Sequence, residues 1–154
     1  MVRACGDPGR EGRWITPAIQ NAYTALHRAG WAHSVEAWPQ DRLVGGLYGI
    51  AIGGLFAGES MFHRERDASK VALLGLHGLL AADGDARRII DVQWRTDHRA
   101  TLGVAAVARR DCPELLRAGR TAPPPARGTF RPPGPRVAPP TASTPPRRCP
   151  ARAP

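Results

Sequence analysis

The sequence predicts an α+β fold in which helices flank a mixed, mostly antiparallel sheet. Three extended runs follow one another between residues 32 and 62 with only short turns between them, which is typical of an antiparallel meander. A helix of about 15 residues then precedes a fourth run, and a crossover of that length can return a strand parallel to its partner. At 154 residues the chain is long enough for one domain and not comfortably for two.

Net charge and proline gather at the C-terminal end of the chain. The 22 Lys and Arg residues outnumber the 13 Asp and Glu residues and give a formal charge of +9, yet residues 119–154 hold seven arginines and no acid. Residues 1–118 therefore carry only +2, and 12 of the 16 prolines follow residue 120. With few large apolar residues, that segment cannot offset the entropy of ordering its backbone. We expect a disordered tail over 119–154, an irregular lead-in over 1–13 and a folded domain over 14–118.

The folded domain opens with a helix over residues 17–29. Thr16 is suited to the N-cap because its hydroxyl accepts a hydrogen bond from a free backbone N–H, and Pro17 loses nothing at the first helical position. Apolar side chains then recur at helical spacing, and Gly30 is placed to end the helix.

Three strands follow, over residues 32–38, 43–52 and 55–62. The first alternates small or apolar with polar residues, as a half-buried strand does, and Pro39-Gln40-Asp41 forms the turn after it. Gly53-Gly54 forms a tight hairpin turn between the second and the third. Connections this short make neighbouring strands antiparallel, so the three strands pair in chain order.

The remainder of the domain is predicted from capping residues and apolar spacing. Asp67 is suited to cap a helix that runs to about Ala82, where Asp83-Gly84-Asp85 breaks it. The elements after it are a strand over 88–94, a short helix over 97–103, a last strand over 104–109 and one or two helical turns over 111–117.

The same sequence excludes several classes of protein. No stretch approaches the roughly 20 apolar residues that a membrane helix needs, and the N-terminus lacks the apolar core of a secretory signal. The three cysteines are widely spaced and form neither a disulfide framework nor a zinc motif, and His33 and His98 have no third ligand at useful spacing. We therefore expect no bound metal and a reducing, cytoplasmic setting.

Two polar residues on the predicted strand over 88–94 are candidates for proton handling. Asp91 and Gln93 share one face by strand alternation. A glutamine side-chain oxygen can accept a hydrogen bond from an attacking amine, and a carboxylate two residues away could hold and polarise that amide. The alternative from pattern alone is a pair of solvated polar residues near the end of a strand.

Glu59 is a third candidate, on the predicted strand over 55–62. Alternation places it on one face with Leu55, Ala57 and Met61, where a lone carboxylate is costly to bury without a partner. It would meet a cationic ligand or orient an amine. The alternative is an ion pair with a local arginine such as Arg64 or Arg66.

Three groups of motifs stand in a set order along the folded domain. They are Trp14-Ile15-Thr16-Pro17 with Ala22-Tyr23 and Leu26-His27; Ala32-His33-Ser34-Val35-Glu36, Leu43-Val44-Gly45-Gly46-Leu47-Tyr48-Gly49, Gly58-Glu59-Ser60-Met61-Phe62 and Ala68-Ser69-Lys70; and Ile90-Asp91-Val92-Gln93, His98 and Leu102-Gly103. Over about residues 3–118 the chain resembles the C-terminal domain of bacterial leucyl/phenylalanyl-tRNA–protein transferases.

That resemblance implies an acetyltransferase-like (GNAT-type) fold and an aminoacyltransferase activity. Members of the family move leucine or phenylalanine from its tRNA onto proteins that begin with Arg or Lys, which marks those proteins for degradation in the N-degron pathway. The implied partners are aminoacyl-tRNA and such proteins. No cofactor and no metal is implied, and we expect a cytoplasmic monomer without a membrane partner.

The resemblance also assigns roles to particular residues. It places Gln93 and Asp91 at the reaction centre and Glu59 where the cationic N-terminal residue of the acceptor arrives. Gly58 is small where a substrate backbone can approach, and four apolar residues line the pocket for the transferred side chain: Leu47, Met61, Leu76 and Ile90. Spacing alone favours ordinary core positions for these four residues.

The family carries an N-terminal domain before the region that resembles this chain. The resemblance therefore implies a C-terminal catalytic domain only, and leaves open whether that truncated form is active. Two alternatives stand beside it. One is a noncatalytic fragment that binds N-terminal Arg or Lys peptides, or RNA through the arginines of the tail. The other is an acyltransferase that uses a small thioester, which is disfavoured because no Gly-rich loop leads from a strand into a helix.

Overall fold

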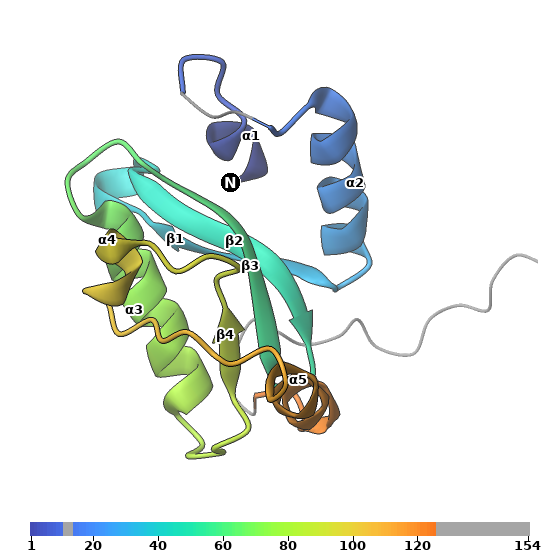
Figure 1. The fold of residues 1–154 in the computed structure, drawn as a ribbon. Coiled ribbons are helices and arrows are strands. Elements are labelled where there is room, and N and C mark those ends of the chain that lie inside the picture. Colours follow the sequence, from blue (N-terminus) through green and yellow to red (C-terminus); the bar gives the residue numbers. More distant parts are fainter. Residues whose placement is uncertain (11–13, 126–154) are drawn as a thin grey trace, which may run out of the picture.

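The computed structural model describes residues 1–10 and 14–125. Its elements in chain order are α1 (Val2–Cys5), α2 (Pro17–Arg28), β1 (Ala32–Ala37), η1 (Pro39–Asp41), β2 (Gly45–Ile52), β3 (Leu55–His63), α3 (Ala68–Ala81), β4 (Ile89–Asp91), α4 (Asp97–Ala100) and α5 (Cys112–Thr121). The strands form one sheet in the order β1-β2-β3-β4. Helix α3 covers one face, α1 and α2 lie on the other, and α5 contacts β3 and β4 (Figure 1).

The sheet has the mixed topology that the sequence predicts. β1, β2 and β3 form the antiparallel meander, with Ala32 opposite Ile50 at the start of β1. β4 lies parallel to β3, with Leu55 opposite Ile89. The crossover that makes this pairing possible is α3, so the α+β prediction and the parallel return of the fourth strand are confirmed.

A β-bulge interrupts the pairing of β2 with β3. The two pairs that flank it are Tyr48–Ser60 and Gly49–Gly58. Glu59 is thus an extra residue in β3 with no partner in the register. A Cβ on Gly49 would lie 2.2 Å from the carbonyl oxygen of Ala57, so the two strands approach this closely only because residue 49 is glycine.

The bulge reverses the alternation of side chains along β3. Phe56 and Met61 both belong to the cluster that packs against α3, although an unbroken strand would send them to opposite faces. Leu55 instead lies beside Gly119 of α5. The expectation that Leu55 and Met61 share one face with Glu59 is therefore wrong, because one inserted residue shifts the period of the strand.

Two apolar clusters lie on the two faces of the sheet. The cluster under α3 consists of Leu47, Phe56, Ala72, Leu76 and Leu80, and the cluster under α1 and α2 consists of Cys5, Ile15, Tyr48 and Phe62. Phe56 and Leu76 are almost completely buried, and burial of side chains of this size stabilises a fold by about 1.5–3 kcal/mol each.

The helix caps agree only in part with the sequence prediction. Thr16 Oγ1 accepts a hydrogen bond from the backbone N–H of Ile19, so the predicted start of α2 is confirmed. Asp67 occupies the N-cap of α3 with a left-handed φ of 64° and makes no side-chain cap bond. Its carboxylate lies 2.6 Å from Nζ of Lys70 instead, so the expected capping bond is wrong.

Both ends of the described chain contain more helix than the sequence predicts. Residues 2–5 form α1 within the expected lead-in, because the Cys5 side chain is buried against the sheet. Helix α5 runs to Thr121, past the expected boundary at residue 118. The rest of the predicted disordered tail, from residue 126, lies outside the described residues. Within the described part, no helix has the length and apolar character to cross a bilayer.

The second half of the sheet is smaller than predicted. The fourth strand ends at Asp91 rather than at residue 94, and the short helix ends at Ala100. Residues 104–109 form no strand, which corrects the prediction of a last strand there. The pair Ala105-Ala106 gives this segment little of the branched surface that favours sheet pairing, and it runs from α4 to α5 as an irregular connection (Figure 1).

Candidate functional site

A cavity of about 240 Å³ opens beside the carboxyl end of β4. Its walls come from β2, β3, α3, β4 and the turn that follows β4. The residues of this cavity that the sequence singles out are Leu47, Gly58, Glu59, Met61, Leu76, Ile90 and Gln93. Residues far apart in the chain therefore meet at one concave site. Asp91 does not line this cavity but borders a second, larger groove next to it.

Gln93 lies on a turn and not on a strand. Its backbone has a left-handed φ of 66°, a conformation that costs a residue with a side chain about 1–3 kcal/mol. Asp91 Oδ1 accepts a hydrogen bond of 2.8 Å from the Gln93 backbone N–H and so supports this turn. The expectation of a shared strand face is wrong because β4 has ended, yet the two residues still lie together. The Asp91 carboxylate contacts the backbone of Gln93, and not the side-chain amide that the sequence argument assumed.

The side-chain amide of Gln93 is oriented by two hydrogen bonds across the cavity. Nε2 donates to the carbonyl oxygen of Gly58 at 3.1 Å and to Oε2 of Glu59 at 3.4 Å. Since both bonds use the nitrogen, the amide oxygen points the other way and keeps its capacity as an acceptor. Gln93 and Glu59, separated by 34 residues in sequence, thus form one polar pair at the bulge.

Glu59 faces two hydroxyl-bearing rings and not an arginine. Burial raises the pKa of Tyr23 to about 12, with further contributions from the charge of Glu59 and from its hydrogen bond with the tyrosine. Tyr23 is therefore protonated near neutral pH and can donate to the carboxylate. Arg66 pairs with Asp67 at 3.5 Å, and Arg64 donates to the Leu43 carbonyl at 3.2 Å. Among the described residues Glu59 forms no ion pair with an arginine, so the alternative of a local arginine partner is not observed.

Tyr48 adds a buried hydroxyl to the same wall. Its ring meets the ring of Tyr23 edge to face, with centroids 5.1 Å apart. Burial raises the pKa of Tyr48, and its hydroxyl has no hydrogen-bond partner among the described residues. Both tyrosines lie within the sequence motifs, but no pattern in the sequence indicates a role for either. They meet near Glu59 only because of how α2 packs on the sheet.

Arg99 is a site residue that sequence reasoning missed. From α4 its Nη1 donates to the carbonyl oxygens of Val92 and Trp94, each at 2.9 Å. These two bonds hold the turn that carries Gln93. No pattern in the sequence signals this contact, since it requires α4 to fold back onto the turn. Trp14 and Trp94 also line the cavity; Trp14 is about half exposed and Trp94 is largely exposed, which places them at its mouth.

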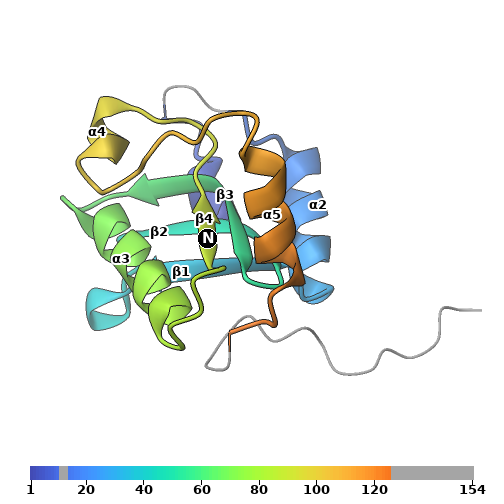
Figure 2. The same ribbon diagram turned by 60° about the horizontal axis from the view of Figure 1, so that its bottom comes forward.

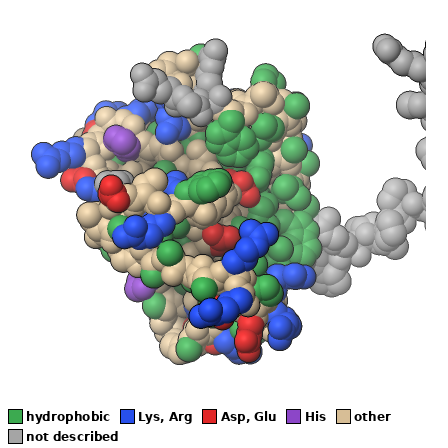
Figure 3. All heavy atoms as spheres, viewed as in Figure 1, with side chains coloured by type: hydrophobic (Ala, Val, Ile, Leu, Met, Phe, Trp, Pro, Cys, Tyr) green, Lys and Arg blue, Asp and Glu red, His purple; other side chains and the backbone are tan. Residues whose placement is uncertain are grey.

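The histidines and the charged surface were also candidates for binding. A ring nitrogen of His33 lies 3.1 Å from the Gly30 carbonyl oxygen, and the side chain of His98 lies outside the described part. No group of three His, Cys, Asp or Glu side chains within residues 1–10 and 14–125 is arranged to hold a metal ion. On the face in Figure 3, Lys and Arg side chains are scattered among carboxylates and do not form one continuous basic surface.

Comparison with known proteins identifies the family. The model of the family described as leucyl/phenylalanyl-tRNA protein transferase matches residues 1–117, which include every residue of the cavity. This chain belongs to that family. The resemblance inferred from the motifs over residues 3–118 is thereby confirmed.

Individual transferases of the family match at high identity. The protein named leucyl/phenylalanyl-tRNA–protein transferase of Shewanella woodyi is 47% identical over 125 residues, which are 80% of this chain and 52% of the relative. The one from Chromohalobacter salexigens is 55% identical over 111 residues, 71% of this chain and 43% of the relative. The chain thus spans about half the length of the curated relatives that it matches.

Proposed function

We propose that this chain carries the reaction centre of a leucyl/phenylalanyl-tRNA–protein transferase. It would move leucine or phenylalanine from aminoacyl-tRNA to the N-terminal Arg or Lys of a protein and so mark that protein for degradation in the N-degron pathway. The observation that carries the proposal is the polar pair of Gln93 and Glu59 in a cavity that also has an apolar wall, in a chain of this family.

The reaction needs positioning more than activation. The acceptor's amine nitrogen attacks the ester carbonyl carbon, the new C–N bond forms, the bond to the ribose oxygen breaks, and a proton from the amine ends on that oxygen. The free amide oxygen of Gln93 would accept a hydrogen bond from the attacking amine and hold it in line with the carbonyl. Asp91 would keep the turn of Gln93 in place through the backbone N–H.

Glu59 supplies the charge that the acceptor requires. Its carboxylate lies within hydrogen-bonding distance of the Gln93 amide, so it would attract the cationic terminus to the point where the amine must attack. Tyr23 donates to the same carboxylate and would fix its orientation. In this role Glu59 is a positioning group for the amine and for the cationic first residue of the acceptor.

The apolar wall would receive the transferred side chain. Leu47, Met61, Leu76 and Ile90 line the cavity, and Met61 can repack to accept either a branched or a flat side chain. Gly58 also lines the cavity and presents no side chain there, so a substrate backbone could approach it. A Cβ at this position would lie 3.3 Å from the carbonyl oxygen of Asp91, which is a tight contact.

Three finer expectations belong to the same proposal. The fold would be of the acetyltransferase (GNAT) type, which the meander followed by a parallel fourth strand supports. Residues 14–118 would be the transferase domain. The protein would work as a cytoplasmic monomer with aminoacyl-tRNA and Arg- or Lys-initiated proteins as its partners.

The test is transfer of labelled leucine from leucyl-tRNA to a peptide that begins with Arg. Gln93→Ala should lower the rate by about 10²-fold or more with an unchanged Tm, and Gln20→Ala on α2, outside the cavity, should leave the rate unchanged. Equal rates for Gln93→Ala and the parent chain would contradict the assigned role. If the parent chain transfers nothing, even with the N-terminal half of a relative added in trans, but still binds the peptide, it is a noncatalytic binding fragment.

A further inference from the structure

The outer edge of β4 has no strand beside it within the described residues. β4 ends the sheet order, and its inner edge pairs with β3. The Ile89 N–H donates to the Gly54 carbonyl at 3.1 Å, so residue 89 directs its polar groups towards β3. Because successive residues of a strand alternate, the N–H and C=O of Ile90 point to the outer edge. Such an edge is a template for pairing with another extended chain.

A groove of about 1050 Å³ runs along this outer edge. Helix α3 forms one wall, residues 101–107 form another, and α5 contributes at one end (Figure 2). Most of the lining is apolar, and it includes Leu74, Leu80, Val104, Val107 and Leu115. The predicted strand over 104–109 would have been a candidate to pair with this edge, but in the structure that segment forms no strand.

The groove is continuous with the cavity that holds the polar pair. The residues that line both are Leu73, Ile90, Val92, Gln93 and Trp94. A chain lying in the groove therefore ends at Gln93, on the side from which an amine would have to approach. The groove and the cavity are two arms of one site that meet at the carboxyl end of β4.

The charges along the groove favour a cationic terminus at that end. Lys70 is paired with Asp67 at 2.6 Å, and Arg88 is paired with Asp83. Asp91 borders the groove next to Gln93 and has no Lys or Arg partner among the described ion pairs. Glu59 follows just inside the cavity, so two carboxylates flank Gln93. The lining also holds two arginines that form no described ion pair: exposed Arg95 in the groove, and Arg99 in the cavity, whose Nη1 donates to the carbonyl oxygens of Val92 and Trp94.

We propose that the groove binds the first residues of the acceptor polypeptide as an added strand. The peptide pairs antiparallel with the outer edge of β4, its amino terminus lies at Gln93 and Glu59, and one of its residues exchanges both backbone hydrogen bonds with Ile90. At about 3.3 Å per residue, the third or fourth residue of the peptide lies opposite Ile90. This inference rests on the proposed function and deepens it by assigning the acceptor's path.

Backbone pairing has a consequence for specificity. Main-chain hydrogen bonds supply affinity whatever the side chains are. The groove therefore recognises the extended backbone of the residues beyond the first, and not their side chains. The acceptor must therefore present several unfolded residues, and a terminus that is folded into a helix is not a substrate.

The test measures binding of fluorescent octapeptides that begin with Arg to the full chain, with leucine transfer assayed in parallel. Backbone N-methylation removes one N–H donor, and it is placed at residue 3, at residue 4 or, as the matched control, at residue 7. One of the first two peptides should bind about tenfold more weakly, and the other should not, because alternate residues point their N–H groups away from β4. The residue 7 peptide should bind like the unmodified one.

A pair of protein variants tests the groove itself. Ala105→Trp fills the groove, whereas Ala108→Trp makes the same change on the same exposed segment at a residue that does not line it. The first should raise the peptide's Kd about tenfold and the second should not, with Tm unchanged in both. Neither residue belongs to the catalytic machinery.

Each outcome separates this inference from the proposed function. The expected binding pattern without any transfer would support the groove and contradict catalysis by this chain. Equal binding of all N-methylated peptides, or no peptide binding at all, would overturn the groove even if leucine is transferred. If Ala105→Trp changes the oligomeric state or Tm of the free chain but not the peptide's Kd, the groove is covered by a second copy or by another part of this chain, and the inference is wrong.

Discussion

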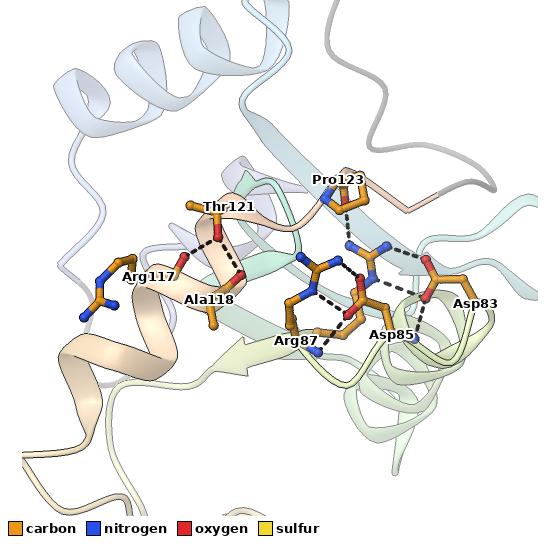
Figure 4. A network of polar contacts seen from close by, with 8 residues as sticks. Asp83, Asp85, Arg87, Arg117, Ala118, Thr121 and Pro123 are labelled. Carbon is orange, nitrogen blue, oxygen red and sulfur yellow. Dashed lines mark hydrogen bonds and ion pairs between the residues drawn. The ribbon is translucent and has the colours of Figure 1, made fainter.

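The two ends of β4 are built in opposite ways. At its amino end, Arg88 directs its guanidinium to both oxygens of Asp83 and to the carbonyl of Pro123, and Arg87 pairs with Asp85 at 2.7 Å (Figure 4). At its carboxyl end, the chain turns through the left-handed conformation of Gln93. At the amino end, the charged side chains are paired with neighbouring residues. At the carboxyl end, polar groups point into a cavity.

The amino end of this short strand therefore contributes to stability, whereas the carboxyl end contributes to the candidate site. The amino end joins the turn after α3 to the end of α5, so its contacts hold three elements together. The carboxyl end keeps an amide oxygen, two carboxylates and a sheet edge available for a ligand. A strand of three residues can serve both purposes because its two ends face different neighbours.

The largest effect should follow from a change at the carboxyl end. Glu59→Gln keeps the shape of the side chain but removes the charge that attracts the cationic acceptor, so leucine transfer should fall by about 10²-fold or more while Tm stays constant. Glu114→Gln in the first turn of α5 removes the same charge away from the cavity and should leave transfer unchanged. A fall in Tm for Glu59→Gln would mean that the carboxyl end also supports the fold, which would end the contrast between the two ends.

At the amino end, the next largest effect should come from overpacking. A Cβ on Gly119 would lie 3.0 Å from Ile89 Cδ1 and 3.4 Å from Leu55 Cβ, so Gly119→Val should lower the free energy of unfolding by about 1–3 kcal/mol. Gly78→Val on α3 is the matched control, since among the described residues only neighbouring backbone of the same helix lies near a Cβ there. Chemical denaturation of both variants measures the difference, and equal stability would show that α5 is loosely packed on β4.

A smaller loss of stability should follow from removing the buried arginine. Arg88→Met keeps the length of a side chain that is 6% exposed but removes its bonds to Asp83 and Pro123, so Tm should fall by about 4 °C. Arg87→Met changes a neighbouring arginine that is 49% exposed and should lower Tm less. Thermal unfolding followed by circular dichroism would decide, and the reverse order of the two shifts would contradict the anchoring role of Arg88.

The smallest expected effect is on the stability of the fold at acid pH. Hydrogen bonds from Arg87 lower the pKa of Asp85 from 3.8 to about 2. Because the pKa is lower in the folded chain, this pair stabilises the fold above pH 4 and loses that contribution as pH falls from about 4 to about 2. The parent chain should therefore lose slightly more stability over this interval than Asp85→Asn, as denaturation midpoints at each pH would record. Parallel acid profiles would mean that the exposed pair contributes nothing measurable.

Several elements could be predicted from local chemistry because their causes lie within a few residues. Thr16 and Pro17 mark the start of α2, where the first backbone N–H groups of a helix have no partner within it. The Thr16 side chain accepts a hydrogen bond from one of these groups, and Pro17 has no N–H to leave unpaired. The tight turn at Gly53-Gly54 places β2 beside β3 in the correct order. The apolar residues assigned to a pocket were found through the family's motifs, since spacing alone could not separate a cavity wall from a core.

Other features could not be predicted from the sequence because they depend on how separate elements fold against one another. The bulge at Glu59 exists because Gly49, on another strand, lets the Ala57 carbonyl approach. The Gln93 turn is held by Arg99, which reaches it only after α4 folds back. Strand alternation predicted both polar residues on regular strands, and in both cases an irregularity brings them together instead.

The sequence by itself determined the family, the order of helices and strands from α2 to β4, and the residue types that the chemistry needs. These follow from local backbone preferences, apolar spacing and ordered motifs, all of which are visible in the amino-acid sequence. Only the tertiary structure decided that Gln93 and Glu59 form one polar pair, that Asp91 supports a backbone turn, and that the outer edge of β4 lies beside a groove with no strand next to it among the described residues. The first depends on packing between segments more than 30 residues apart, the second on the strand ending at Asp91 so that Gln93 turns, and the third on the position of β4 within the sheet.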